Sequence, residues 1–122
     1  MRDTLKRWLP LVCWVVLIFA LSSVPDVTPG DIRFPRGTDK VVHFTEYAIL
    51  AVLFYRGLSY GRERSERLMF WVTVATAAGV GVLDELYQSY VPGRDSSMMD
   101  LAADLLGIVT GSFLSMSRDI RK

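Results

Sequence analysis

The residues of this chain that could do chemistry are charged side chains at the ends of apolar stretches. The acidic ones are Asp39, Glu46, Asp84, Glu85, Asp100 and Asp104, and the basic ones beside them are Lys40, Arg94 and, when protonated, His43. Ionisable groups in such segments are costly in a bilayer and mark functional sites by default. Because carboxylates packed in a low dielectric cannot all stay ionised without compensation, we expect that some hold protons or that the cluster binds a cation.

These residue types favour metal or acid–base chemistry. Carboxylate oxygens and one imidazole suit a divalent metal cation, and the predicted metal ligands are Asp84, Glu85, Asp100 and Asp104. An amine on a substrate is the alternative cation. His43 or Glu46 could act as a general base, and Arg94 could hold a phosphate or carboxylate through two hydrogen bonds. The further catalytic candidates are Lys40 and Gln88, and the further substrate-binding candidates are Asp39 and Tyr87.

Each of these side chains also has a purely structural interpretation. Asp39 could cap a helix, Lys40 could extend to the head groups, and Arg94 could contact lipid phosphate. Glu46 could pair with His43 or Arg94, and the remaining polar residues could form interhelical hydrogen bonds. The expected convergence of all of them at one end of a bundle favours a functional site over these separate explanations.

Composition and motifs argue against several classes of protein. The net charge of +1 and the lack of a helix-turn-helix, zinc-finger or RNA-binding pattern argue against nucleic acid as a partner. No serine-nucleophile, Walker or dinucleotide motif is found, so covalent serine or cysteine catalysis is not expected. The single cysteine, Cys13, lies in an apolar stretch and cannot form an internal disulfide.

Four apolar blocks must position the polar groups. At about 20 residues per bilayer crossing, they predict transmembrane helices near residues 8–24, 39–58, 67–88 and 97–117. The 122 residues allow one domain, 1–122, and the expected fold class is an all-α integral membrane bundle of four helices. The first block has a second interpretation as a secretory signal, with basic residues before it and a cleavage site near Ala20 and Ser22. Cleavage there would remove one wall of the polar cluster.

Helical spacing places the polar groups on shared faces. The three faces are Asp39, His43 and Glu46 or Tyr47; Asp84 and Gln88; and Asp100, Asp104, Gly107 and Gly111. The pair Gly107 and Gly111 forms a Gly-x-x-x-Gly packing face, so the aspartates of that stripe should also point into the bundle. Gly79 and Gly81 predict close approach on the third helix. Together the faces predict one polar pocket below one surface of the bundle.

The connecting segments carry turn and capping signals. Prolines and glycines make residues 25–37 an irregular loop. Pro92-Gly93 predicts a turn within residues 90–94. Thr38 or Asp39 is expected to cap the second helix, and the fourth helix is expected to be capped from the run Asp95, Ser96 and Ser97.

The basic residues predict how the chain is oriented. Most lie at the N-terminus, between the second and third helices, and at the C-terminus: Arg2, Lys6, Arg7, Arg56, Arg62, Arg64, Arg67, Arg118, Arg121 and Lys122. The other two loops hold Arg33, Arg36, Lys40 and Arg94. Since cytoplasmic loops carry the excess of Lys and Arg, we expect both termini in the cytoplasm and the polar site facing outward, away from cytoplasmic ATP.

Four linked motifs run through the chain. They are Asp39-Lys40-Val41-Val42-His43, Asp84-Glu85-Leu86-Tyr87-Gln88, Val91-Pro92-Gly93-Arg94 and Asp100-Leu101-Ala102-Ala103-Asp104-Leu105-Leu106-Gly107. In this order and spacing the chain resembles the VanZ-like family over about residues 38–112, and the preceding helix also fits. One departure is Asp104, whose position is often asparagine in the family. The additional negative charge strengthens the expectation of a bound cation.

The resemblance implies a protein of the bacterial cytoplasmic (inner) membrane that works on the cell envelope, with membrane lipids as partners. The family is named for a membrane protein associated with resistance to glycopeptide antibiotics, teicoplanin in particular, and also occurs outside resistance clusters. We expect metal-assisted chemistry on an anionic lipid or lipid-linked envelope precursor. The alternative is a non-catalytic protein that binds an envelope lipid or antibiotic, or that braces a complex, for instance as a homo-oligomer. A lone transporter is disfavoured because the sequence has no inverted repeat.

Overall fold

Four helices make up the described structure. This computed structural model describes residues 1–25, 37–61 and 63–119. It contains α1 (Arg2–Ser22), α2 (Thr38–Ser59), α3 (Glu66–Tyr90) and α4 (Met98–Asp119), and no strand occurs among those residues. All four helices are long and apolar enough to cross a membrane, which confirms the predicted all-α membrane fold. The predicted irregular loop and several basic residues lie largely outside the described residues: 26–36, Arg62, Arg121 and Lys122.

The helices are longer than the apolar blocks that predicted them. α1 begins at Arg2 rather than near residue 8, and α3 runs from Glu66 to Tyr90. The apolar block marks only the part of a helix that suits hydrocarbon, whereas charged residues continue the helix beyond it. Asp3 and Glu66 lie in first turns, where the helix dipole favours negative charge.

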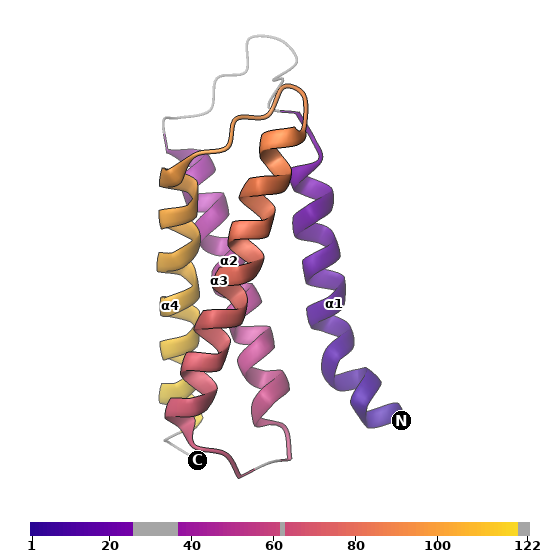
Figure 1. Ribbon diagram of the computed structural model, residues 1–122. Coiled ribbons are helices and arrows are strands. Elements are labelled where there is room, and N and C mark those ends of the chain that lie inside the picture. Colours follow the sequence, from indigo (N-terminus) through magenta and orange to yellow (C-terminus); the bar gives the residue numbers. More distant parts are fainter. Residues whose placement is uncertain (26–36, 62, 120–122) are drawn as a thin grey trace.

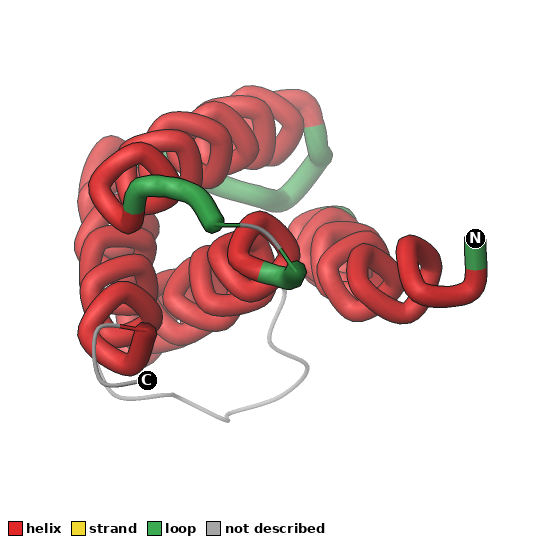
Figure 2. The backbone as a smooth tube through the Cα atoms, turned by 90° about the horizontal axis from the view of Figure 1, so that it is seen from below, coloured by secondary structure: helices red, strands yellow, loops and turns green. Residues whose placement is uncertain are grey.

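Three helices form the body of the bundle, and α1 leans against one side of it (Figures 1 and 2). Among the four described helices, α1 contacts α2 and α3 but not α4. The apolar core lies at the middle of the bundle and consists of Ile18, Tyr47, Leu50, Ala51, Ala77 and Ile108. Figure 1 places the start of α1 and the end of α4 at the same end of the molecule. The starts of α2 and α4 therefore lie at the opposite end.

Contacts along its length attach α1 to α2. The Trp14 indole N–H donates to the Glu46 backbone carbonyl over 2.9 Å, and the Arg7 guanidinium donates to the Gly57 carbonyl. Ile18 is fully buried in the shared core. These contacts favour a permanent membrane helix over a cleaved secretory signal for the first apolar block.

The glycine stripe of α4 packs directly on the backbone of α2. A Cβ atom added to Gly107 would overlap the Phe44 carbonyl, and one added to Gly111 would overlap the Ala48 carbonyl. Gly111 follows Gly107 by four residues on α4, and Ala48 follows Phe44 by four residues on α2. The two helices therefore run side by side in the same direction. The predicted Gly-x-x-x-Gly packing face is confirmed.

The expectation for α3 is half right. A Cβ atom on Gly81 would lie 3.4 Å from the Tyr47 ring and 3.6 Å from Asp104 Oδ2, so this glycine is packed against α2 and α4 at ordinary van der Waals distances. Gly79 is exposed, and apart from its chain neighbours and the backbone of its own helix no atom of the described residues lies within 4 Å of its Cβ position. The prediction was wrong for Gly79 because a two-residue step along a helix turns by about 200°, so the two glycines cannot share one face.

The helix caps also differ from the expectation in one place. Gly37 is the N-cap of α2, with a φ of 88°, and as a glycine it has no side chain that could cap the helix. The prediction that Thr38 or Asp39 would cap it was wrong, since the helix already includes both residues. In α4 the Ser97 hydroxyl accepts the Met99 backbone N–H over 3.1 Å, which confirms the predicted serine cap.

Candidate functional site

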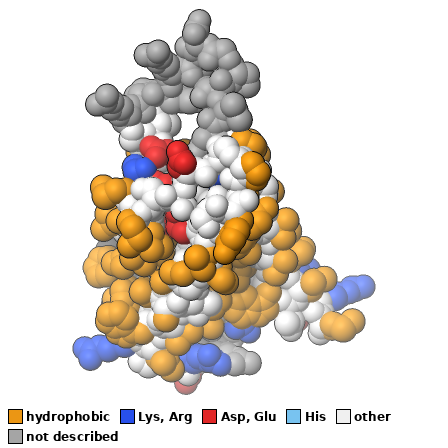
Figure 3. All heavy atoms as spheres, turned by 45° about the horizontal axis from the view of Figure 1, so that its top comes forward, with side chains coloured by type: hydrophobic (Ala, Val, Ile, Leu, Met, Phe, Trp, Pro, Cys, Tyr) orange, Lys and Arg blue, Asp and Glu red, His pale blue; other side chains and the backbone are white. Residues whose placement is uncertain are grey.

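The predicted site residues gather at the end of the bundle away from the start of α1. Figure 3 shows acidic and basic side chains near the upper end of the molecule, hydrophobic side chains over its flanks, and further Lys and Arg side chains at the lower end. The upper end is where α2 and α4 begin and where α3 finishes. Segments that are distant in the sequence therefore bring their polar groups to one level.

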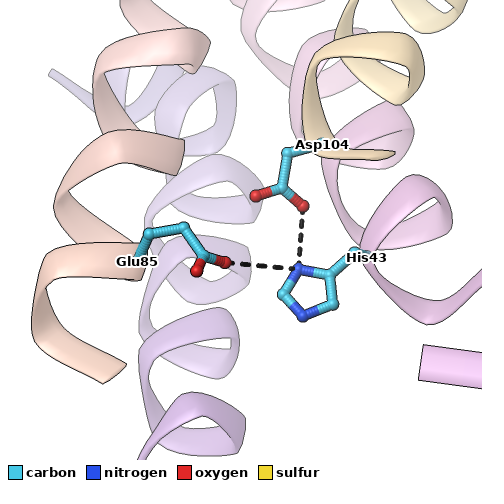
Figure 4. A group of neighbouring side chains, drawn as sticks. All are labelled: His43, Glu85 and Asp104. Atoms are coloured by element: carbon cyan, nitrogen blue, oxygen red, sulfur yellow. Dashed lines mark hydrogen bonds and ion pairs between the residues drawn. The ribbon is translucent and has the colours of Figure 1, made fainter. Parts of the chain in front are cut away.

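His43 lies at the centre of the buried part of this site, with a carboxylate on each of two other helices directed toward it (Figure 4). Its Nδ1 is 2.9 Å from Asp104 Oδ1 and 4.0 Å from Glu85 Oε1. The exposed fractions are 5% for His43, 9% for Glu85 and 0% for Asp104. One imidazole and two carboxylates from α2, α3 and α4 thus form a compact buried group that suits a divalent metal or a protonated histidine.

The start of α4 holds Glu85 in place. The Ser97 backbone N–H donates to Glu85 Oε2 over 3.1 Å, while the hydroxyl of the same serine caps the helix. The other carboxylate oxygen, Oε1, is directed toward His43. The cap of α4 and the orientation of Glu85 therefore depend on one residue.

A second buried group surrounds Asp84. Its Oδ2 accepts the Tyr47 hydroxyl over 3.1 Å and the Gln88 side-chain amide over 3.3 Å. The same amide also donates to the Ser22 hydroxyl over 3.0 Å. Asp84, Tyr47 and Gln88 are all buried, so this group joins α1, α2 and α3 inside the bundle.

Lys40 forms the rim of the site together with two aspartates. Its ammonium nitrogen is 2.5 Å from Asp39 Oδ2 and 2.5 Å from Asp100 Oδ1. Asp39 is exposed, whereas Asp100 is buried one turn before Asp104 on α4. The four predicted metal ligands are thus divided: Asp100 pairs with Lys40, Asp84 pairs with neutral donors, and Glu85 and Asp104 lie beside His43.

Arg94 reaches across the site from the turn that joins α3 and α4. The Arg94 N–H donates to the Val91 carbonyl over 3.2 Å, and Gly93 has a φ of 78°, which only glycine adopts at little cost. This confirms the predicted turn. The guanidinium donates to Gln88 Oε1 over 3.4 Å and to the Val24 carbonyl over 3.1 Å. It therefore connects the Asp84 group to the end of α1.

Two further candidates lie on the side of the site that faces α1. The Tyr87 hydroxyl is 2.7 Å from Ser23 Oγ, and its ring packs on Phe19 with centroids 5.7 Å apart. Tyr87 thus attaches α1 to α3 rather than joining the buried group around His43. Glu46 is half-buried, and His43 is among its electrostatic neighbours.

The buried carboxylates have more acceptor capacity than the site satisfies. Within the described parts of the chain, Asp84 Oδ1, Glu85 Oε1 and Asp104 Oδ2 have no hydrogen-bond donor. Buried polar atoms in native proteins nearly always have a partner. These oxygens therefore have room for protons or a cation, and which of the two they hold stays a prediction.

Three residues that build this site were given no catalytic, binding or metal role by the sequence, although Tyr47 was placed on the polar face of the second helix and Ser97 was named as a possible cap. They are Ser22, Tyr47 and Ser97, which bond respectively to Gln88, Asp84 and Glu85. The spacing of Tyr47 from His43 carried a signal, because the two residues share a helix face. Ser22 carried a weaker signal, as a polar residue close to the end of the first apolar block. The bond from Ser97 is made by a backbone N–H, which no side-chain pattern reveals.

The fold and the site together define a class: a multi-pass membrane protein with a buried histidine–carboxylate group at one end of a four-helix bundle. A family model described as VanZ/LLP1 matches residues 7–119, which is nearly the whole chain and includes most of α1. The chain therefore belongs to the VanZ-like family. No curated protein and no solved structure gives a significant match.

Proposed function

We propose that this VanZ-like protein works in the bacterial cell envelope, at the outer face of the cytoplasmic membrane, on an anionic lipid or lipid-linked head group. One observation carries the proposal: Lys40, paired with Asp100, and Arg94, bonded to Gln88, border the two buried acidic groups around His43 and Asp84. A phosphate needs charge-assisted donors, and an acidic pocket beside them needs a cation. An anionic head group together with a metal cation supplies both.

In the enzymatic form of this proposal the chemistry is metal-assisted. Arg94 binds the anionic oxygens, and the carboxylates beside His43 hold the cation. Glu46, half-buried and with His43 and Arg94 among its electrostatic neighbours, is the general base. Resistance to glycopeptide antibiotics, including teicoplanin, is one consequence that a changed envelope precursor would have.

The second candidate is a non-catalytic membrane protein that binds an envelope lipid or antibiotic, or that braces a larger assembly. Burial favours it: Asp84, Gln88 and Asp104 are almost completely enclosed by the helices. Gln88 also uses both ends of its amide within the protein. Such a group could serve only to hold the bundle together.

The orientation can be tested by cysteine labelling of a Cys13→Ser protein. Ser96 and Glu63 are both exposed and lie in loops at opposite ends of the bundle. A membrane-impermeant maleimide should label Ser96→Cys on intact cells, whereas Glu63→Cys should be labelled only after permeabilisation. The reverse pattern would place the site in the cytoplasm and overturn the proposal.

Head-group binding can be tested by native mass spectrometry of the detergent-solubilised protein. We expect phosphatidylglycerol and a polyprenyl phosphate to bind more tightly than zwitterionic phosphatidylcholine. A hydrogen bond to a charged group contributes about 1.5–3 kcal/mol, so Arg94→Gln should weaken binding by roughly 10- to 100-fold. Arg64→Gln, an exposed arginine between α2 and α3, is the matched control and should bind as the parent does.

The same spectra separate the two forms of the proposal. A change in the mass of the bound polyprenyl phosphate, absent with Glu46→Gln, would support chemistry. Binding without conversion would support the non-catalytic form. Equal affinities for the three lipids, or equal losses in Arg94→Gln and Arg64→Gln, would contradict an anionic head group as the ligand.

A further inference from the structure

We propose that His43, Glu85 and Asp104 are the ligands of one divalent transition-metal cation. The inference rests on the proposed function for its site and deepens it, because it names three ligands and a class of metal. It also differs from the sequence-based set of four carboxylates. Of that set, two residues are retained, two are assigned to other contacts, and a histidine is added.

One pair of the three ligand atoms has the spacing of a coordination shell, and the third atom lies slightly farther away. The atoms offered by His43, Glu85 and Asp104 all lie within 4.8 Å of one another. Ligands at about 2.1 Å from a metal are roughly 3.0–3.4 Å apart along the edges of an octahedral or tetrahedral shell. The 2.9 Å between His43 Nδ1 and Asp104 Oδ1 is close to this spacing. The 4.0 Å to Glu85 Oε1 needs only a small rotation of a glutamate side chain.

The carboxylates in this group also have unused acceptors. Asp104 is fully buried, and in the described portion of the chain its Oδ2 has no donor, as is also true of Glu85 Oε1. Figure 4 shows the two carboxylates facing each other beside the imidazole. A cation between them would satisfy both oxygens at once, whereas a proton on His43 Nδ1 is directed to Asp104 Oδ1 at 2.9 Å and lies 4.0 Å from Glu85 Oε1, so it leaves both of these oxygens without a donor.

The surrounding contacts fix these ligands and exclude the other two aspartates. Glu85 is oriented by the Ser97 N–H, an outer contact of the kind that positions metal ligands. Asp100 is 2.5 Å from the Lys40 ammonium, which would repel a metal at that carboxylate. Asp84 is outside the group of ligand atoms and accepts the Tyr47 hydroxyl.

The ligand set points to a class of metal. An imidazole nitrogen with two carboxylates is favoured by Zn²⁺ and Mn²⁺, whereas Mg²⁺ and Ca²⁺ take oxygen ligands. Three protein ligands also leave positions for water or for an oxygen of the head group, as in catalytic rather than structural metal sites. The competing explanation is a protonated His43 that pairs with the two carboxylates and binds no metal.

The experiment is a metal titration of the full-length protein in detergent, after removal of metal with a chelator. Binding of Mn²⁺, Zn²⁺, Mg²⁺ and Ca²⁺ is measured by calorimetry, with elemental analysis for stoichiometry. We expect one Zn²⁺ or Mn²⁺ per chain, and loss of this binding in His43→Gln and Glu85→Gln. Glutamine at 85 keeps an acceptor for the Ser97 N–H, so this variant should remain folded.

The neighbouring acids provide matched comparisons. The comparison variants are Asp84→Asn, Asp100→Asn and Asp95→Asn. Asp84 precedes Glu85 in the sequence, Asp100 lies one turn before Asp104, and Asp95 lies in an exposed loop. These variants should retain metal affinity within about tenfold of the parent, because they leave the coordinating atoms intact. Circular dichroism of every variant confirms that a loss of binding is not a loss of fold.

Three outcomes would overturn the inference: no stoichiometric binding of any metal, equal losses in the Glu85→Gln and Asp84→Asn variants, or Mg²⁺ or Ca²⁺ binding that His43→Gln leaves unchanged. The first outcome would leave a protonated His43 as the explanation of these contacts. No lipid is added in this titration, so its failure is separate from failure of the Arg94-dependent binding of phosphatidylglycerol or polyprenyl phosphate.

Discussion

Replacement of Gly107 by alanine should strongly destabilise the bundle. The new methyl group would overlap the Phe44 carbonyl and lie 3.1 Å from the Ala48 backbone nitrogen. Because these are backbone atoms and not flexible side-chain ends, α4 must move away from α2. Overpacking of a well-packed interior costs about 1–3 kcal/mol and occasionally more. We expect a loss in this range from detergent unfolding, and a larger loss when Gly111→Ala is combined with it.

Gly79→Ala is the matched control for this prediction. Gly79 also lies within an apolar helix, but its Cβ position is open among the described residues. Alanine there should be neutral or stabilise the helix by up to about 1 kcal/mol, because glycine is the poorer helix former. If Gly107→Ala were tolerated as well as Gly79→Ala, the direct backbone contact between α2 and α4 would be contradicted.

Close packing of α4 was predictable because both helix periodicity and residue size are local properties. Asp100, Asp104, Gly107 and Gly111 follow one another at three- and four-residue steps, which fixes their common face without knowledge of the partner helix. All four residues of the stripe are buried, so they point into the bundle as predicted. The sequence could not show which helix this stripe would contact, since α2 and α3 both carry small residues and polar groups.

The pairing of the site residues was less predictable for the same reason. The helical spacing of polar residues predicts that Asp84 and Glu85 lie near the other polar groups. Adjacent residues on a helix, however, point about 100° apart. Asp84 therefore meets Tyr47 and Gln88, while Glu85 meets His43 and Ser97. A difference of one position decides which carboxylate lies beside the imidazole, and this depends on the rotation of α3 in the bundle.

The role of α1 could not be predicted from the sequence, for a different reason. Its hydropathy fits either a membrane helix or a secretory signal, because both need only an apolar run after basic residues. The distinguishing contacts are single long-range bonds, such as Trp14 to the Glu46 carbonyl and Ser22 to Gln88. Such bonds leave no periodic pattern. They show why the end of α1 belongs to the site: Ser22 and the Val24 carbonyl bond to Gln88 and Arg94.

Asp84→Leu should destabilise the protein, whereas Asp84→Asn should not. Leucine removes the acceptor of the Tyr47 hydroxyl and of one Gln88 bond, and both donors are buried. An unsatisfied buried group costs about 1–3 kcal/mol, although interhelical hydrogen bonds in membranes average nearer 0.6 kcal/mol. For two donors we therefore expect a total loss of about 1–3 kcal/mol from detergent unfolding. Asparagine keeps an acceptor oxygen and removes a buried negative charge, so its unfolding midpoint should equal or exceed that of the parent.

Tyr47→Phe separates the hydrogen bond from the charge in this prediction. It deletes one donor and keeps the ring against Gly81, so it should cost less than Asp84→Leu. If both Asp84 variants were equally unstable, the negative charge itself would be required, and a cation at Asp84 would be the simplest partner for it. If both were as stable as the parent, the bonds to Tyr47 and Gln88 would contribute nothing measurable. The expected order, with asparagine stable and leucine unstable, makes Asp84 a structural acceptor that holds α2 and α3 together beside the His43 group.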